Sequence, residues 1–173
     1  MKKTRLLTYL WTFVWDLIMW FVIAQVTIAR GGKFAWQDYG LWGILPTRYM
    51  RKRRGKGIRG IALCHGGFLS KVGFGDSEDT TETEAHEGVH VELYEVCTLV
   101  GLVLGLIVFT WLFFGLNTPI SACVLGGLIW LGLYPAVIGA GHVVAKVRGE
   151  DIYLGASHEE AARAIAADKM ESQ

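Results

Sequence analysis

The chain has 173 residues, of which 52% are hydrophobic and 19% charged, and its mean hydropathy is +0.35. This composition departs from the soluble average toward that of membrane proteins, and the length excludes a second large domain. The formal net charge of +1 conceals a basic stretch over residues 30–59 and an acidic one over residues 76–95. The three cysteines contain no CxxC pair, which argues against a disulfide framework and against a cysteine-ligated zinc site.

The first hydrophobic stretch, residues 6–29, follows Lys2, Lys3 and Arg5. It is longer than the hydrophobic region of a signal peptide, so we expect a retained transmembrane helix. Asp16 falls near its middle, where an unpaired carboxylate is costly. This residue is either a buried acid that hydrogen-bonds a neighbouring helix or a contact for a proton or a substrate.

Residues 30–80 form a predicted extramembrane loop that carries most of the basic charge. Two short segments of strand-forming residues, IALC at 61–64 and GFLSKVGF at 67–74, lie beside Gly66-Gly67. This pattern predicts a β-hairpin in the loop.

A long uncharged stretch follows, because no Lys, Arg, Asp or Glu occurs from Val96 to Ala145. One turn signal, Asn117-Thr118-Pro119, interrupts it. A helix needs about 20 residues to cross a bilayer, so the stretch divides into two spans. We expect one helix over residues 81–116, a third transmembrane helix over 120–145, and an amphipathic helix within 146–173.

The motif with the clearest chemistry lies on the helix expected at 81–116. Thr81 and Glu84 form a capping box, after which the chain reads His86-Glu87-Gly88-Val89-His90. Histidines at i and i+4 project from one helical face and can bind one Zn²⁺ ion, while Glu87 can act as general base toward a water molecule. The alternative is a solvated helical turn with two exposed histidines.

The sequence HEGVH, followed by a membrane span and a helix reading E-x-x-A-x-x-x-A, resembles the gluzincin pattern of HExxH plus a distal glutamate. In layout it is similar to membrane metallopeptidases of the CAAX-processing and heat-shock type, and HVELYE resembles small bacterial and phage proteins reading HExxHVxQYE. The resemblance implies that Glu159, with Ala162 and Ala166, is the third metal ligand. His158 is the alternative ligand in a shifted register, and Arg163 departs from the aspartate usual in the pattern.

Two further histidines are candidates for supporting roles. His142 ends the third predicted span and is either a metal ligand or, more simply, an interfacial residue packed against a neighbouring helix. His65, in the predicted hairpin, is either a substrate contact or a structural residue.

These features predict an all-α integral membrane protein with three transmembrane helices and a small α+β zincin-like extramembrane part. The expected function is that of a membrane-anchored zinc metallopeptidase that cleaves polypeptides near the membrane surface. The alternative is a non-enzymatic membrane assembly or lysis-related factor with a structural or degenerate metal site. The expected partners are the lipid bilayer, including anionic lipids, and a polypeptide substrate, with no nucleic acid; the sequence does not predict the oligomeric state.

The distribution of basic residues predicts the orientation in the cell inner or plasma membrane. The cluster at 48–59, with Lys146 and Arg148, favours a cytoplasmic loop and C-terminal tail. Lys2, Lys3 and Arg5 favour a cytoplasmic N-terminus, which three full crossings would not allow. Either the larger cluster dominates or the first hydrophobic stretch does not fully cross.

Overall fold

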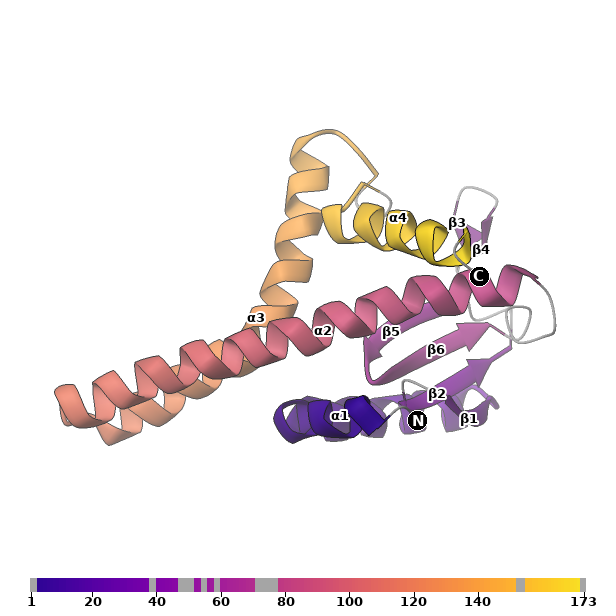
Figure 1. Cartoon of the computed structure of the whole chain (residues 1–173). Helices are drawn as coiled ribbons and strands as arrows, with labels where there is room; N and C mark the ends of the chain where they lie inside the picture. The colour runs from indigo at the N-terminus through magenta and orange to yellow at the C-terminus, as the bar shows by residue number, and fades with distance from the viewer. Residues whose placement is uncertain are drawn as a thin grey trace. The chain divides into compact units, whose positions relative to one another are not determined.

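The structure is a computed structural model that describes residues 3–37, 40–46, 52–53, 56–57, 60–70, 78–151 and 155–171. It is mostly helical and includes a small sheet (Figure 1). Three of its helices are long and apolar enough to cross a membrane, which confirms that part of the prediction. In chain order the elements are α1 (Lys3–Ala29), β1 (Lys33–Gln37), β2 (Gly40–Leu45), β3 (Lys52–Arg53), β4 (Lys56–Gly57), β5 (Gly60–Cys64), β6 (Gly66–Ser70), α2 (Glu78–Thr110), a π-helical turn (Trp111–Gly115), α3 (Pro119–Val147) and α4 (Ser157–Glu171).

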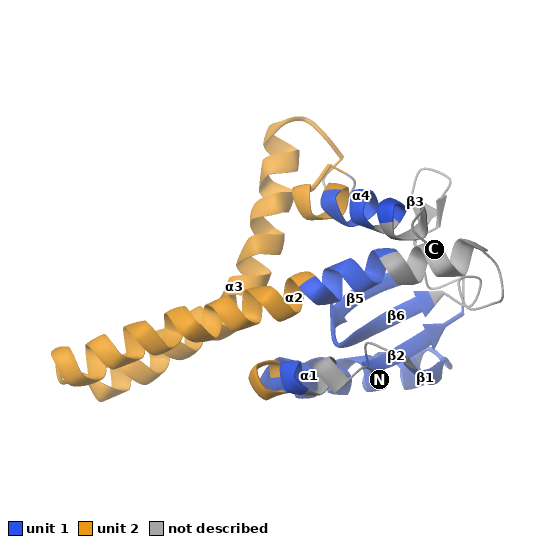
Figure 2. Ribbon diagram, viewed as in Figure 1, with its two compact units in different colours: residues 1–9, 13–92, 161–173 blue, residues 10–12, 93–160 orange. Residues whose placement is uncertain are grey.

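The chain divides into two compact units, which Figure 2 shows in different colours. Unit 1 contains residues 1–9, 13–92 and 161–173, and unit 2 contains residues 10–12 and 93–160. Both α2 and α4 contribute residues to each unit.

The sheet of unit 1 has four strands in the order β1-β2-β6-β5. β1 pairs antiparallel with β2, β2 parallel with β6, and β6 antiparallel with β5. The predicted hairpin corresponds to β5 and β6, although its turn lies at His65 and not at Gly66-Gly67. The strands β1 and β2 were not predicted. The basic cluster at 48–59 and the side chains of the predicted capping box lie largely outside the described residues.

Helix α1 packs against this sheet through polar and aromatic side chains. Asp16, Ile23 and Thr27 on this face are buried, and the Trp20 and Trp36 rings meet edge to face at 5.3 Å. The Asp16 carboxylate accepts a hydrogen bond from the His65 backbone N–H at 3.2 Å, and its other oxygen lies 2.9 Å from His65 Nδ1. Asp16 is therefore a buried, hydrogen-bonded acid, and these two of its contacts are with the turn between β5 and β6.

Unit 2 contains a helical hairpin formed by the C-terminal part of α2 and by α3. The turn between them places Asn117 at φ +52°, a conformation that asparagine tolerates, and Pro119 opens α3 at a position that needs no N–H donor. Pro135 lies inside α3, and Figure 1 shows that this helix changes direction along its length. A proline inside a helix removes one backbone hydrogen bond and introduces such a bend.

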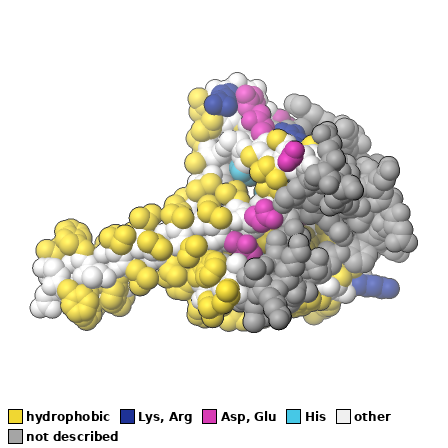
Figure 3. Space-filling view, in the orientation of Figure 1, with side chains coloured by type: hydrophobic (Ala, Val, Ile, Leu, Met, Phe, Trp, Pro, Cys, Tyr) yellow, Lys and Arg dark blue, Asp and Glu magenta, His cyan; other side chains and the backbone are white. Residues whose placement is uncertain are grey.

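Glycines allow the two helices of the hairpin to approach closely. A Cβ atom on Gly101 would lie 2.7 Å from the Trp130 carbonyl oxygen, and one on Gly105 would lie 2.5 Å from that of Gly126. Gly101 and Gly105 have the GxxxG spacing that brings helix backbones together in lipid. The outer surface of the hairpin in Figure 3 is covered mainly by hydrophobic side chains, as expected for helices that face acyl chains.

The close contact at Gly105 leads to a specific expectation. Replacing Gly105 by Ala should force α2 and α3 apart and destabilise the hairpin by about 1–3 kcal/mol, the usual cost of overpacking. Gly127→Ala is the matched control, because a Cβ there has nothing within 4 Å. Thermal unfolding in detergent should show a lower midpoint for Gly105→Ala alone; equal midpoints for both variants would contradict the packing.

Candidate metal centre

Two histidines on α2 place a pair of ring nitrogens close together in unit 1. The Nε2 atoms of His86 and His90 lie 3.2 Å apart, with the rings nearly perpendicular at 81°. Two nitrogens bound to a tetrahedral zinc ion at about 2.0–2.1 Å would be separated by roughly 3.3 Å. The pair therefore has the spacing that one such ion requires.

The environment of the pair differs from that of a solvated surface turn. His90 is only 7% exposed and His86 is half-buried, while Val89 and Val91 beside them are buried. The alternative of two exposed histidines on a hydrated helix is therefore wrong.

Glu87 is held against the sheet by a hydrogen bond that the sequence did not indicate. Its side chain is 4% exposed, and its Oε2 accepts the backbone N–H of Ala62 at 2.7 Å. Ala62 lies on β5, an edge strand whose only partner in the four-stranded sheet is β6. A Cβ on Gly60 would lie 2.7 Å from Glu87 Oε1, so the glycine leaves room for the carboxylate. The orientation of Glu87 is thus set by β5.

The other predicted ligands lie on α4, at its N-terminal end in unit 2. Glu159 is 5% exposed, and His158 packs against α3, with its ring 4.9 Å from that of His142. The Nδ1 atom of His158 lies 2.6 Å from the position that a Cβ on Gly141 would occupy. The carboxylate of Glu159, the next residue on the helix, lies 3.9 Å from His158 Nε2.

Among the described residues, His86, His90 and Glu159 could hold a metal ion, since each offers one ligand atom. A set of two imidazoles and one carboxylate is a familiar ligand set for zinc. His158 and His142 pack against each other, so their rings have a structural contact within unit 2 whether or not a metal is bound.

His65 occupies a different place, against α1. Its Nε2 lies 3.2 Å from Thr8 Oγ1, its Nδ1 faces Asp16, and its side chain is fully buried. Both ring nitrogens therefore have partners within unit 1, which fits the structural interpretation of this residue. Burial, together with the nearby negative charge of Asp16, raises the pKa of the Cys64 thiol, so this cysteine stays protonated and unreactive at neutral pH.

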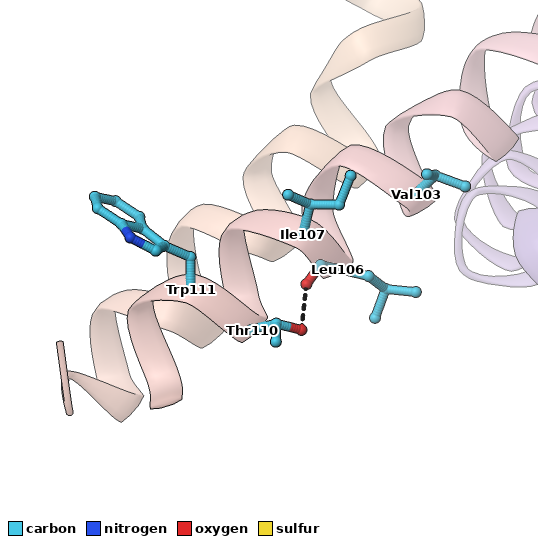
Figure 4. Close-up of a pocket in the computed structure, with 5 residues that line it drawn as sticks. All are labelled: Val103, Leu106, Ile107, Thr110 and Trp111. Carbon is cyan, nitrogen blue, oxygen red and sulfur yellow. Dashed lines mark hydrogen bonds between the residues drawn. The ribbon is translucent and has the colours of Figure 1, made fainter. Parts of the chain in front are cut away.

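The surface of α2 has a shallow hollow of about 490 Å³ in unit 2. Figure 4 shows its lining, Val103, Leu106, Ile107, Thr110 and Trp111, with the Thr110 hydroxyl bonded to the Leu106 carbonyl oxygen at 2.8 Å. None of these side chains is ionisable. The hollow suits an apolar chain and offers no chemistry of its own.

Comparison of the chain with models of known protein families, with curated proteins and with solved structures gave no match. The chemical argument for the metal centre therefore depends on the residues themselves.

The spacing of the histidines predicts about one zinc ion per chain. Replacing both His86 and His90 by Ala should abolish binding, because it removes two of the three proposed protein ligands. His142→Ala should retain the metal, since that side chain packs against His158. Elemental analysis of the purified protein measures this directly, and unchanged metal content in the double variant would contradict the site.

Proposed function

We propose that the protein is a membrane-anchored zinc metallopeptidase that hydrolyses peptide bonds near the membrane surface. The observation that carries this proposal is the 3.2 Å separation of the two histidine Nε2 atoms on α2, with Glu87 between them in sequence. Paired histidines with an adjacent glutamate on one helix are typical of zinc-dependent hydrolysis.

His86, His90 and Glu159 would hold the zinc ion and leave its fourth position open to water or substrate. A bound zinc ion would act as a Lewis acid that polarises a carbonyl group and lowers the pKa of water to about 7. Three protein ligands with one open position distinguish catalytic zinc sites from closed structural ones. The ligand set therefore favours catalysis.

Glu87 would be the catalytic base. The Ala62 N–H donates to one carboxylate oxygen, which restricts rotation of the side chain and orients the carboxylate to accept a proton from the attacking water. The same carboxyl group would then donate the proton to the leaving amine. Its burial keeps bulk water from competing for these hydrogen bonds.

The position of the motif along α2 favours membrane-proximal polypeptides as substrates. His90 precedes Val96, the start of the uncharged stretch, by six residues, which is about 9 Å along a helix. With the α2–α3 hairpin in the bilayer, the centre would lie at headgroup depth. The basic residues favour the cytoplasmic side for the loop and for α4.

One observation favours a non-enzymatic alternative, a membrane assembly or lysis-related factor with a structural metal site. Glu87 accepts the N–H of Ala62 on the edge strand β5, so its carboxylate has a structural role that requires no catalysis. The two functions differ in whether Glu87 needs its negative charge.

The third ligand can be tested with two neighbouring substitutions. Glu159→Ala should lower zinc affinity strongly, because it removes one of three protein ligands. His158→Ala should keep the zinc, because His158 packs against α3. Zinc titration of each variant against a competing chelator compares the zinc affinities of the two variants. Full affinity in Glu159→Ala with loss in His158→Ala would identify a three-histidine site.

The role of Glu87 can be tested with Glu87→Gln. The amide oxygen of Gln can still accept the Ala62 N–H, so folding and zinc content should be retained. Loss of the base should reduce cleavage of a membrane-tethered reporter peptide by about 10²–10⁴-fold. Unchanged cleavage would contradict the assignment, and wild-type protein that binds zinc but cleaves no peptide in a broad reporter library would favour the structural alternative.

A further inference from the structure

Helix α1 has an unusual distribution of side chains. Thr12, Asp16, Ile23 and Thr27 are buried on one face, while a row of large hydrophobic side chains is 49–71% exposed: Leu7, Leu10, Phe13, Leu17, Phe21 and Ile28. Their spacing of three or four residues places them on one side of the helix, with the exposed Gln25 completing the row between Phe21 and Ile28. An exposed apolar row of this length needs an apolar environment.

The attachment of α1 to the sheet restricts how it can meet a bilayer. Asp16 bonds the turn at His65, and the Gly43 backbone lies against the Thr27 side chain, so α1 and the sheet lie side by side over several turns. If α1 crossed the membrane, it would carry the sheet into the hydrocarbon, with β1 as an open edge. Open sheet edges exposed to lipid do not occur there, because their backbone groups would lack hydrogen-bond partners.

Contacts within unit 2 place one turn of α1 at the level of the membrane edge. The Trp11 indole donates to the Glu95 carbonyl oxygen at 3.2 Å, and the Tyr94 hydroxyl donates to the Thr12 carbonyl oxygen at 3.2 Å. Glu95 is the last acidic residue before the uncharged stretch begins at Val96. This turn of α1 therefore lies where lipid headgroups begin, a position that tryptophan and tyrosine favour.

The basic residues point to the same arrangement. Lys2 precedes α1, Lys3 and Arg5 lie in its first two turns, and Arg30 and Lys33 follow it. A helix that crosses would separate these two groups, whereas a helix that lies flat keeps them both on the cytoplasmic side with the cluster at 48–59. The orientation conflict seen in the sequence then disappears.

We infer that α1 lies in the plane of the membrane, with its hydrophobic row in the acyl chains and both of its ends on the same side. The basic residues at its ends would interact with anionic headgroups, as in other interfacial amphipathic helices. This inference rests on one part of the proposed function, namely that the α2–α3 hairpin crosses the bilayer. The chain would then cross the membrane twice and not three times.

The depth of three residues along the row tests the inference. Single cysteines replace Leu10, Leu17 or Ile28 in a full-length variant without the three native cysteines, and each is spin-labelled in phosphatidylcholine–phosphatidylglycerol vesicles. The collision rates of each spin label with oxygen and with a water-soluble nickel chelate report the depth of that label in the bilayer. We expect similar shallow depths for all three labels. A crossing helix would instead separate Leu10 from Ile28 by about 27 Å of depth and overturn the inference.

Sidedness distinguishes failure of the inference from failure of the hairpin. In sealed vesicles, cysteines at Thr4 and Gln173 should react with an impermeant maleimide from the same side, and one at Asn117 from the opposite side. Thr4 and Gln173 on opposite sides would refute the flat helix. All three on one side would refute the crossing hairpin and, with it, the membrane anchor in the proposed function. Labels on the row that neither oxygen nor the chelate reaches would identify a second copy as the occupant and also overturn the inference.

Discussion

The continuity of α2 is the constraint on which the other features depend. Over its length from Glu78 to Thr110 the chain has no proline, and its glycines at 101 and 105 contact α3 without interrupting the helix. The same helix therefore carries the histidine pair and enters the uncharged hairpin. A break near Glu95 would separate the histidine pair from the uncharged hairpin. Both the spacing of the histidines and their distance from the apolar boundary follow from helical geometry.

As the proposed catalytic base, Glu87 would combine two roles that usually compete. A carboxylate that accepts a backbone N–H is well oriented, and good orientation is what a general base needs. The same hydrogen bond restricts the movement of the carboxyl group between accepting a proton from water and donating it to the leaving amine. The narrow space beside Gly60 limits where the second carboxylate oxygen can point, so the whole group has little room to move.

Features that depend on neighbouring residues in the chain could be predicted from the sequence. The uncharged stretch, the turn at Asn117 and the histidines at i and i+4 are all local patterns, and each appears where expected. The strands β1 and β2 were missed because Gly40 and Gly43 interrupt a short aromatic segment that reads as a loop. The partners of Asp16 and Glu87 could not be predicted, since they lie 49 and 25 residues away and form only when the sheet assembles.

The pairing of Asp16 with His65 also sets an order of events during synthesis. A ribosome adds about 5–20 residues per second, so the 49 residues between these partners take about 2–10 s to appear. During that interval the carboxylate on α1 has no histidine to bond, and entry into lipid would be unfavourable. The polar face of α1 is therefore completed only after the turn between β5 and β6 has been translated, well after the helix itself has been made.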